Sequence, residues 1–167
     1  MNTVKFSLLI LLISMFEMVS AQPIEITNTQ GLALGTFSQY DDVGGTVTVS
    51  NTGSRSATGN VTLIGSTFSY AAFTITTDST DQFSLEIDKP AISLSGSNGG
   101  SMSLQIGTAN PEFPSVVYGS PATVYIGGTL TVGTRSANPS GAYSGNILLT
   151  FNFHYEYHVQ QKKMPYY

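Results

Sequence analysis

Short alternating segments separated by turn residues restrict the fold of this chain more than any other feature of its sequence. In residues 60–64 and 72–76, for example, apolar side chains alternate with Thr, Ala or other small and polar ones. Successive side chains of a β-strand point to opposite faces, so each such segment can cover a core with one face. The clearest segments are residues 45–50, 60–64, 72–76, 83–87, 101–106, 124–132 and 146–159.

The breaks between these segments are rich in Gly, Asn, Asp, Ser and Pro, which are turn-forming residues. The pattern predicts an all-β protein, specifically an immunoglobulin-like Greek-key β-sandwich of about seven to ten short antiparallel strands. Only 10% of the residues are charged, which argues against a helical bundle or a charged disordered chain. We expect one β-sandwich domain over residues 22–159 and a polar and aromatic C-terminal tail over residues 160–167.

The N-terminal segment predicts a secretory signal peptide over residues 1–21. Lys5 precedes an apolar run over residues 6–16, and Val19-Ser20-Ala21 supplies small residues before Gln22, as at a signal-peptide cleavage site. The apolar run is short for a helix that must cross roughly 30 Å of hydrocarbon. We therefore expect a secreted chain without a membrane span after cleavage, located in the periplasm or on the outer cell surface. An uncleaved signal anchor is the alternative.

Composition and residue content exclude several classes of function. The chain carries 10 acidic and 6 basic residues, with a formal net charge of -4, whereas binding a run of phosphates requires the opposite balance. It contains no Cys, which excludes disulfides, thiolate metal sites and cysteine nucleophiles. It has two His and no Gly-x-Ser-x-Gly motif. We predict no nucleic-acid partner, no cofactor, no catalytic residues and no enzymatic activity.

One cluster is a weak candidate for metal binding. His154, Glu156 and His158 alternate along a predicted strand and so share one face. His154 and His158 would lie roughly 13 Å apart on an extended strand, too far to bind one ion without a bend or bulge. A solvated polar face is the favoured interpretation, and no metal site is predicted.

Several motifs together resemble a known family. They are Leu34-Gly35-x-Phe37, Gly45-Thr46-Val47-Thr48-Val49, Thr58-Gly59, Ala71-Ala72-Phe73-Thr74-Ile75, Ile126-Gly127-Gly128-Thr129-Leu130-Thr131-Val132-Gly133 and Gly141-Ala142-Tyr143-Ser144-Gly145. Over roughly residues 30–157 the chain resembles the bacterial secreted domain-of-unknown-function 4402 family, which is similar in pattern to spore-coat-U-like and other fimbrial subunits. The resemblance implies an exported structural or adhesive cell-surface protein, such as a pilus or fimbria-like subunit.

Such a subunit would have like subunits or other surface and pilus proteins as partners, joined to it by strand pairing. Two terminal segments are candidates for this contact. Ile24 and Ile26 alternate with polar residues near the predicted mature N-terminus, and a longer apolar face follows near the C-terminus, made of Phe151, Phe153, Tyr155 and Tyr157. An ordinary strand paired within its own domain is the favoured alternative at each end.

A second hypothesis is a secreted carbohydrate-binding β-sandwich module with glycans as partners. The chain has 9 Tyr and no Trp, and tyrosine rings can stack on sugars. Recovery of the protein in surface filaments would favour the first hypothesis, and affinity of a monomer for insoluble polysaccharide would favour the second.

The sequence also contains an internal similarity. Residues 45–49 and 128–132 match at nearly every position, and each is followed by Arg-Ser-Ala and then by a Gly-Asn segment at residues 59–63 and 145–149. We interpret the two copies as comparable hairpins, one in each half of the sandwich.

Overall fold

The computed structural model describes residues 24–155, in which every regular element is a β-strand. Within this part of the chain no helix is long and apolar enough to cross a membrane. The thirteen strands are β1 (Ile24–Gln30), β2 (Thr36–Gln39), β3 (Gly45–Val49), β4 (Arg55–Gly59), β5 (Val61–Ile64), β6 (Ala71–Thr77), β7 (Phe83–Ile87), β8 (Ala91–Gly96), β9 (Ser101–Asn110), β10 (Ser115–Val116), β11 (Ala122–Val132), β12 (Tyr143–Ser144) and β13 (Phe151–Tyr155).

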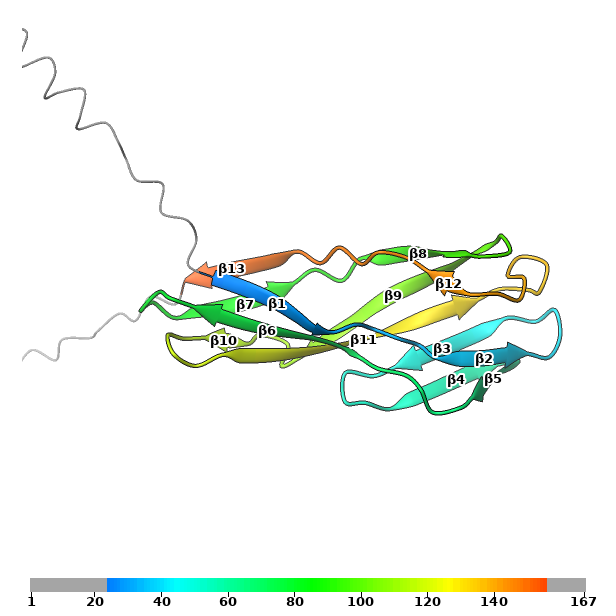
Figure 1. The fold of residues 1–167 in the computed structure, drawn as a ribbon, viewed down its shortest axis with the longest axis horizontal. Helices are drawn as coiled ribbons and strands as arrows, with labels where there is room; N and C mark the ends of the chain where they lie inside the picture. Colours follow the sequence, from blue (N-terminus) through cyan, green and yellow to red (C-terminus); the bar gives the residue numbers. More distant parts are fainter. Residues whose placement is uncertain (1–23, 156–167) are drawn as a thin grey trace, which may run out of the picture.

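These strands form one large sheet and two small ones. The eight-stranded sheet has the order β1-β6-β11-β9-β8-β12, and β3 joins it by pairing with β11 and carries β4 at its outer edge. The small sheets have the orders β10-β7-β13 and β2-β5. They lie towards opposite ends of an elongated molecule (Figure 1). The predicted all-β sandwich is confirmed, with more strands than the seven to ten that the sequence indicated, among them β10 and β12 of two residues each.

The core lies between the large sheet and the two small ones. In β9 the side chains of Met102, Leu104 and Ile106 are buried, while Ser103 and Gln105 between them are exposed. The β7 residues Leu85 and Ile87 belong to the same core cluster. One buried row of side chains on each strand is the pattern expected of antiparallel sheets that have one solvent-exposed face.

Strand β11 is the centre of the large sheet. It pairs with β9 on one side, and on the other it pairs first with β6 and then with β3. The change of partner falls at Gly127-Gly128, where the register with β9 also shifts. A Cβ atom on Gly127 would lie 2.1 Å from the carbonyl oxygen of Val49. Only glycine therefore leaves room for β3 to end beside β11.

The internal similarity has a different structural meaning from the one predicted. Residues 45–49 do form a hairpin, as β3 with β4. However, residues 128–132 pair with β3 itself, with Gly128 opposite Val49 and Val132 opposite Gly45. Residues 145–149 belong to no strand, so the second predicted hairpin is wrong. The two similar segments are neighbours in one sheet rather than halves of separate hairpins.

Both ends of the described chain cross from the large sheet to a small one. Residues 31–35 connect β1 in the large sheet to β2, and residues 145–150 connect β12 in the large sheet to β13. The strand predicted over residues 146–159 therefore begins only at Phe151 and is described as far as Tyr155. Its alternating pattern continues through the crossing because Ile147 and Leu149 still pack against the core.

Candidate functional site

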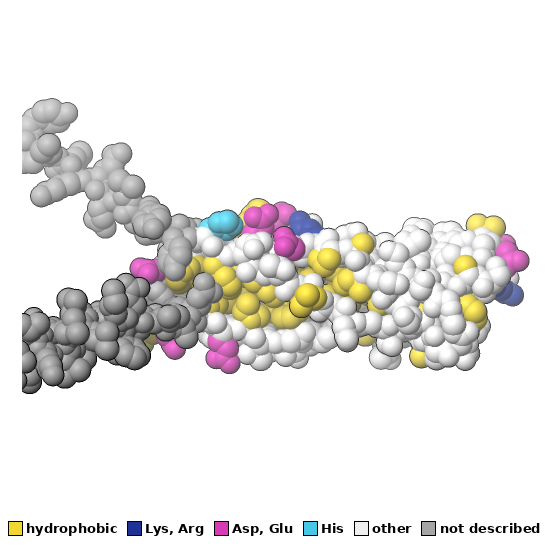
Figure 2. Space-filling view, turned by 90° about the horizontal axis from the view of Figure 1, so that it is seen from above, with side chains coloured by type: hydrophobic (Ala, Val, Ile, Leu, Met, Phe, Trp, Pro, Cys, Tyr) yellow, Lys and Arg dark blue, Asp and Glu magenta, His cyan; other side chains and the backbone are white. Residues whose placement is uncertain are grey.

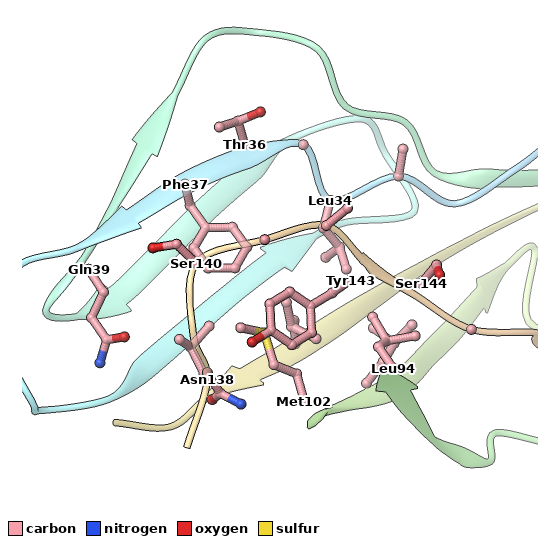
Figure 3. A pocket seen from close by; sticks show the side chains of 18 of the residues that line it. Leu34, Thr36, Phe37, Gln39, Leu94, Met102, Asn138, Ser140, Tyr143 and Ser144 are labelled. Atoms are coloured by element: carbon pink, nitrogen blue, oxygen red, sulfur yellow. The ribbon is translucent and has the colours of Figure 1, made fainter. Parts of the chain in front are cut away.

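A groove lies between the N-terminal and C-terminal parts of the described chain. One wall is formed by residues 32–39, which include β2, and the other by residues 138–147, which include β12. Between them the groove encloses a volume of about 1050 Å³. Figure 3 shows the rings of Phe37 and Tyr143 directed into this space, with Leu94 and Met102 beside Tyr143.

The floor of the groove is the core of the sandwich itself. It is made by Leu94 of β8, Met102 and Leu104 of β9, and Leu130 and Val132 of β11. All five side chains belong to the core cluster and are at most 7% exposed. The groove therefore lies directly over the core, and only a small part of each floor side chain is accessible to solvent.

Each wall of the groove includes a stretch of unpaired backbone groups. Residues 145–149 make no backbone–backbone hydrogen bond with another described residue, and among residues 31–35 only Ala33 makes such bonds, with Ser69. Strand β2 pairs with β5 on one edge only. Rows of free N–H and C=O groups at a sheet edge are able to pair with a further strand. The groove therefore combines an apolar floor with hydrogen-bonding walls.

The C-terminal wall is held by a compact set of contacts. The hydroxyl group of Tyr143 donates a hydrogen bond to the carbonyl oxygen of Pro139 at 2.7 Å, which resembles the tyrosine corner of other sandwiches. The loop packs on the β8–β9 turn, where Asn98 donates to the carbonyl of Ser140 at 2.7 Å. A Cβ atom on Gly141 would lie 2.6 Å from Ser97 Oγ. These contacts explain the Gly-x-Tyr-Ser segment noted in the sequence.

A polar network fixes one end of the groove. Asn138 is 7% exposed, and its side chain accepts a hydrogen bond from the Gly133 amide at 2.5 Å and donates one to the Ser101 carbonyl at 2.6 Å. Gln39 donates to the carbonyl of Gly133 at 2.7 Å. The guanidinium of Arg135 donates to the carbonyls of Gln39 and Tyr40. Strands β2 and β11 are thereby tied together at this end.

A second arginine supports the N-terminal wall from behind. Arg55 Nη2 donates to the carbonyl oxygen of Thr36 at 2.7 Å, and its guanidinium lies 5.8 Å from the centre of the Phe68 ring. Burial lowers the pKa of Arg55 below its ordinary value, but arginine titrates so far above neutrality that it stays charged. The cation therefore serves to position β2.

The loop beyond β2 contains one perturbed carboxyl group. Asp41 accepts hydrogen bonds from the Asn60 side chain at 2.6 Å and from the Val43 amide at 2.9 Å. These two bonds lower the pKa of Asp41 below its ordinary value. The group is exposed, and its bonds indicate loop ordering rather than catalysis.

The N-terminal candidates for subunit contact lie in a paired strand. Ile24 and Ile26 belong to β1, where they lie opposite Thr77 and Ile75 of β6. Both are half-buried and pack against the core. In this structure the segment is therefore paired within its own domain.

Of the four C-terminal candidates for subunit contact, three lie in β13 and one lies outside the described residues. Phe151 and Phe153 lie in β13, paired with β7, and the ring of Phe151 meets that of Phe73 at 5.6 Å. Tyr155 is the last residue of β13, and Tyr157 lies outside the described residues. β1 and β13 are each at an edge of their sheets. Figure 2 shows apolar side chains gathered in a band along the half of the molecule that contains these two strands.

The weak metal candidates form no metal-binding group in the described residues. His154 Nε2 lies 3.7 Å from Glu86 Oε2, and both side chains are largely exposed. Glu156 and His158 lie outside the described residues. Residues 24–155 contain no group of three or more potential metal ligands.

The groove itself was not identified from the sequence, although its residues carried a signal. Leu34, Phe37 and Tyr143 were noted only as parts of family motifs. Their spacing does not reveal that the first and last parts of the sandwich face each other across an opening. That relationship depends on contacts between residues about one hundred positions apart.

The fold and groove define a class of all-β sandwich that is open between the segments containing β2 and β12. A family model described as domain of unknown function (DUF4402) matches residues 24–153, and the chain belongs to this family. No match was found among curated proteins or among solved structures.

Proposed function

We propose that this protein is an exported structural or adhesive subunit of the cell surface, similar to a fimbrial subunit, whose groove accepts an extended strand from a neighbouring subunit. The observation that carries the proposal is the open groove, whose apolar floor lies between two walls that each include a stretch of unpaired backbone, at residues 145–147 and on the edge of β2 that has no strand partner. A β-strand complements both properties, because it presents N–H and C=O groups on its edges and alternate side chains on one face.

The free energies of side-chain burial and of association indicate what kind of strand the groove requires. Each apolar side chain buried on the floor contributes about 1.5 to 3 kcal/mol, while association itself costs on the order of 4 to 15 kcal/mol. One inserted side chain cannot offset that cost. An occupant with several apolar side chains in alternation, supported by backbone hydrogen bonds along the walls, can do so.

Other features of the chain support export and assembly. The predicted signal peptide over residues 1–21 directs the chain out of the cytoplasm. The sandwich needs no disulfide, since the chain contains no Cys and a domain of this size buries about two-thirds of its unfolded surface. Such a domain is suited to a surface structure outside the cell.

The carbohydrate-binding alternative has weaker support. Three of the polar side chains of the groove are already committed, because Gln39 and Asn138 bond to backbone groups and the Tyr143 hydroxyl bonds to Pro139. The strongly exposed tyrosines of the described chain are Tyr40, which follows β2, and Tyr118, between β10 and β11. The β2–β3 and β10–β11 loops lie near opposite ends of the molecule (Figure 1). The two tyrosines therefore do not form one platform for a sugar ring.

The proposal is tested by placing a charge in the groove of the full chain in cells that produce it. Leu34→Glu puts a carboxylate on the N-terminal wall, where Leu34 is half-buried and faces the groove. Leu148→Glu is the matched control, because Leu148 is 83% exposed. We expect Leu34→Glu to abolish recovery of the protein in sheared, negatively stained filaments, and Leu148→Glu to leave recovery unchanged.

The melting temperature of each purified variant separates assembly from folding. We expect Leu148→Glu to melt like the parent and Leu34→Glu to melt at a lower temperature, because Leu34 also packs against the core. Filament recovery is therefore compared at a temperature at which both variants are folded. If filaments persist in Leu34→Glu, or if the parent forms no surface assembly and instead binds insoluble polysaccharide as a monomer, the proposal is wrong.

A further inference from the structure

We infer that the strand filling the groove of one copy is supplied by residues 156–167 of a second copy, which makes the assembly a head-to-tail filament. This inference rests on the proposed function and names the donor that the function leaves open. It follows from three properties of the domain: the length of chain on each side of it, the end at which the chain leaves it, and the direction of the last strand.

Only the C-terminal side of the domain offers enough chain. Between the predicted cleavage site and β1 stand Gln22 and Pro23 alone, and β1 is already paired with β6. By contrast, residues 156–167 follow the last described residue of β13. At about 3.3 Å for each extended residue they reach roughly 40 Å, whereas the wall formed by residues 32–39 spans roughly 26 Å. The segment is long enough to line the whole groove.

The place at which the chain leaves the domain shows that residues 156–167 cannot fill the groove of the same copy. β13 runs away from the groove and ends at the other end of the molecule, next to the start of β1 (Figure 1). From Ile147, at the near end of the groove, to Tyr155 the chain advances by about 26 Å if extended. A tail that turned back would use about two-thirds of its length to reach Ile147 again. Too little would remain to fill the groove of the same copy.

The direction of the strands allows a neighbour to be reached by simple translation. The arrows of β2 and β13 point in opposite directions along the long axis (Figure 1). A tail that continues in the direction of β13 enters a neighbour placed ahead of it at the end held by Gln39 and Asn138, and runs antiparallel to β2. Repeating this contact gives an open filament, as any head-to-tail interface does when its rotation does not close a ring.

The sequence of the segment provides side chains for such insertion. Tyr157 and Val159 continue the alternation of Phe151 and Phe153, and the polar residues His158 and Gln160 occupy the opposite positions. The apolar pair would reach the neighbour first, near Phe37 and Ser140 at the entrance of the groove (Figure 3). Met164 and the two final tyrosines supply further apolar side chains deeper in the groove.

A cysteine cross-link tests the donor directly, because the natural chain contains no Cys. Full mature chains with Val159→Cys are mixed with chains with Ser140→Cys under mild oxidation. We expect a disulfide-linked dimer, since bonded cysteines require Cα atoms within about 7 Å of each other. Chains with Ser120→Cys, in the turn before β11, should form at least tenfold less dimer with Val159→Cys. A link that forms only within a chain carrying both Val159→Cys and Ser140→Cys would overturn the inference.

A second set of full-chain variants separates this inference from the proposed function. Tyr157→Asp with Val159→Asp should abolish filaments without changing the melting temperature, while His158→Asp with Gln160→Asp, which adds the same number of carboxylates on the other face, should preserve them. If filaments survive the first pair but not Leu34→Glu, the donor is another strand and only the inference fails. If filaments survive in all variants, the proposed function fails as well. A lowered melting temperature for the first pair would place the segment in its own domain and overturn the inference.

Discussion

Individual residues maintain the groove mainly by fixing its walls. Asn138 ties the end of β11 to the start of β9, and Tyr143 ties β12 to the loop before it. Gly127 and Gly141 allow backbone segments to approach where a side chain would collide with its neighbours. Their roles are visible only in three dimensions, because the sequence marks them as turn or family residues without naming the atoms that they meet.

A substitution at Leu130 tests which face of the central strand β11 is buried. It is 2% exposed and lies opposite Val47 on one side and Leu104 on the other. Leu130→Asp would bury an unpaired charge, and we expect a loss of about 3 to 5 kcal/mol in the free energy of unfolding. Thr131→Asp is the control, since Thr131 is exposed. Denaturant unfolding checks both variants, and equal stability of Leu130→Asp and the parent would show that the register of β11 is wrong.

Among the elements, the strands with a clear alternation were predictable and the connections between sheets were not. β7 was predicted over the residues that it occupies, and β3, β5, β6, β9 and β11 were predicted within a few residues. Residues 146–150 were wrongly assigned to a strand. Alternation of apolar and polar residues indicates that one face is buried, but it does not indicate whether the backbone is hydrogen-bonded to a neighbouring strand. That missing partner is also the property that makes the groove a candidate site.

Strand β1 gives a prediction at the scale of an element. Because Ile24 and Ile26 pack on their own core and β1 pairs with β6, replacing both with Asp should lower the melting temperature of the monomer. We expect a loss of about 2 kcal/mol or more in the free energy of unfolding. Thr27→Asp with Asn28→Asp, two exposed positions on the same strand, should have a smaller effect.

The melting temperature and the sedimentation profile of these variants decide between two roles of β1. Loss of oligomers only as a consequence of unfolding agrees with a strand paired in its own domain. A fully stable monomer that no longer assembles would instead make β1 the donated strand and contradict the pairing seen here.

At the scale of the whole molecule, the elongated shape would separate the accepting and donating ends of the proposed subunit. The groove lies in one half, between β2 and β12, and the described chain starts and stops at the other end (Figure 1). A subunit of this shape can accept at one end and donate at the other. The sequence predicted the sandwich and the possibility of strand exchange. It did not predict that the groove and the end of β13 lie at opposite ends of the molecule, because this depends on the path of the chain through both layers.

The most direct test of this account is hydrogen exchange of the backbone amides of residues 145–149, measured in assembled subunits from sheared cells and in the dissociated chain. These amides have no backbone partner in the described domain, so they should exchange rapidly in the dissociated chain and at least tenfold more slowly when a strand fills the groove. Gly65 and Ser66, in the turn after β5, serve as the internal control and should exchange alike in both states. Equal, rapid exchange of residues 145–149 in both states would show that the groove stays empty on assembly and contradict the account.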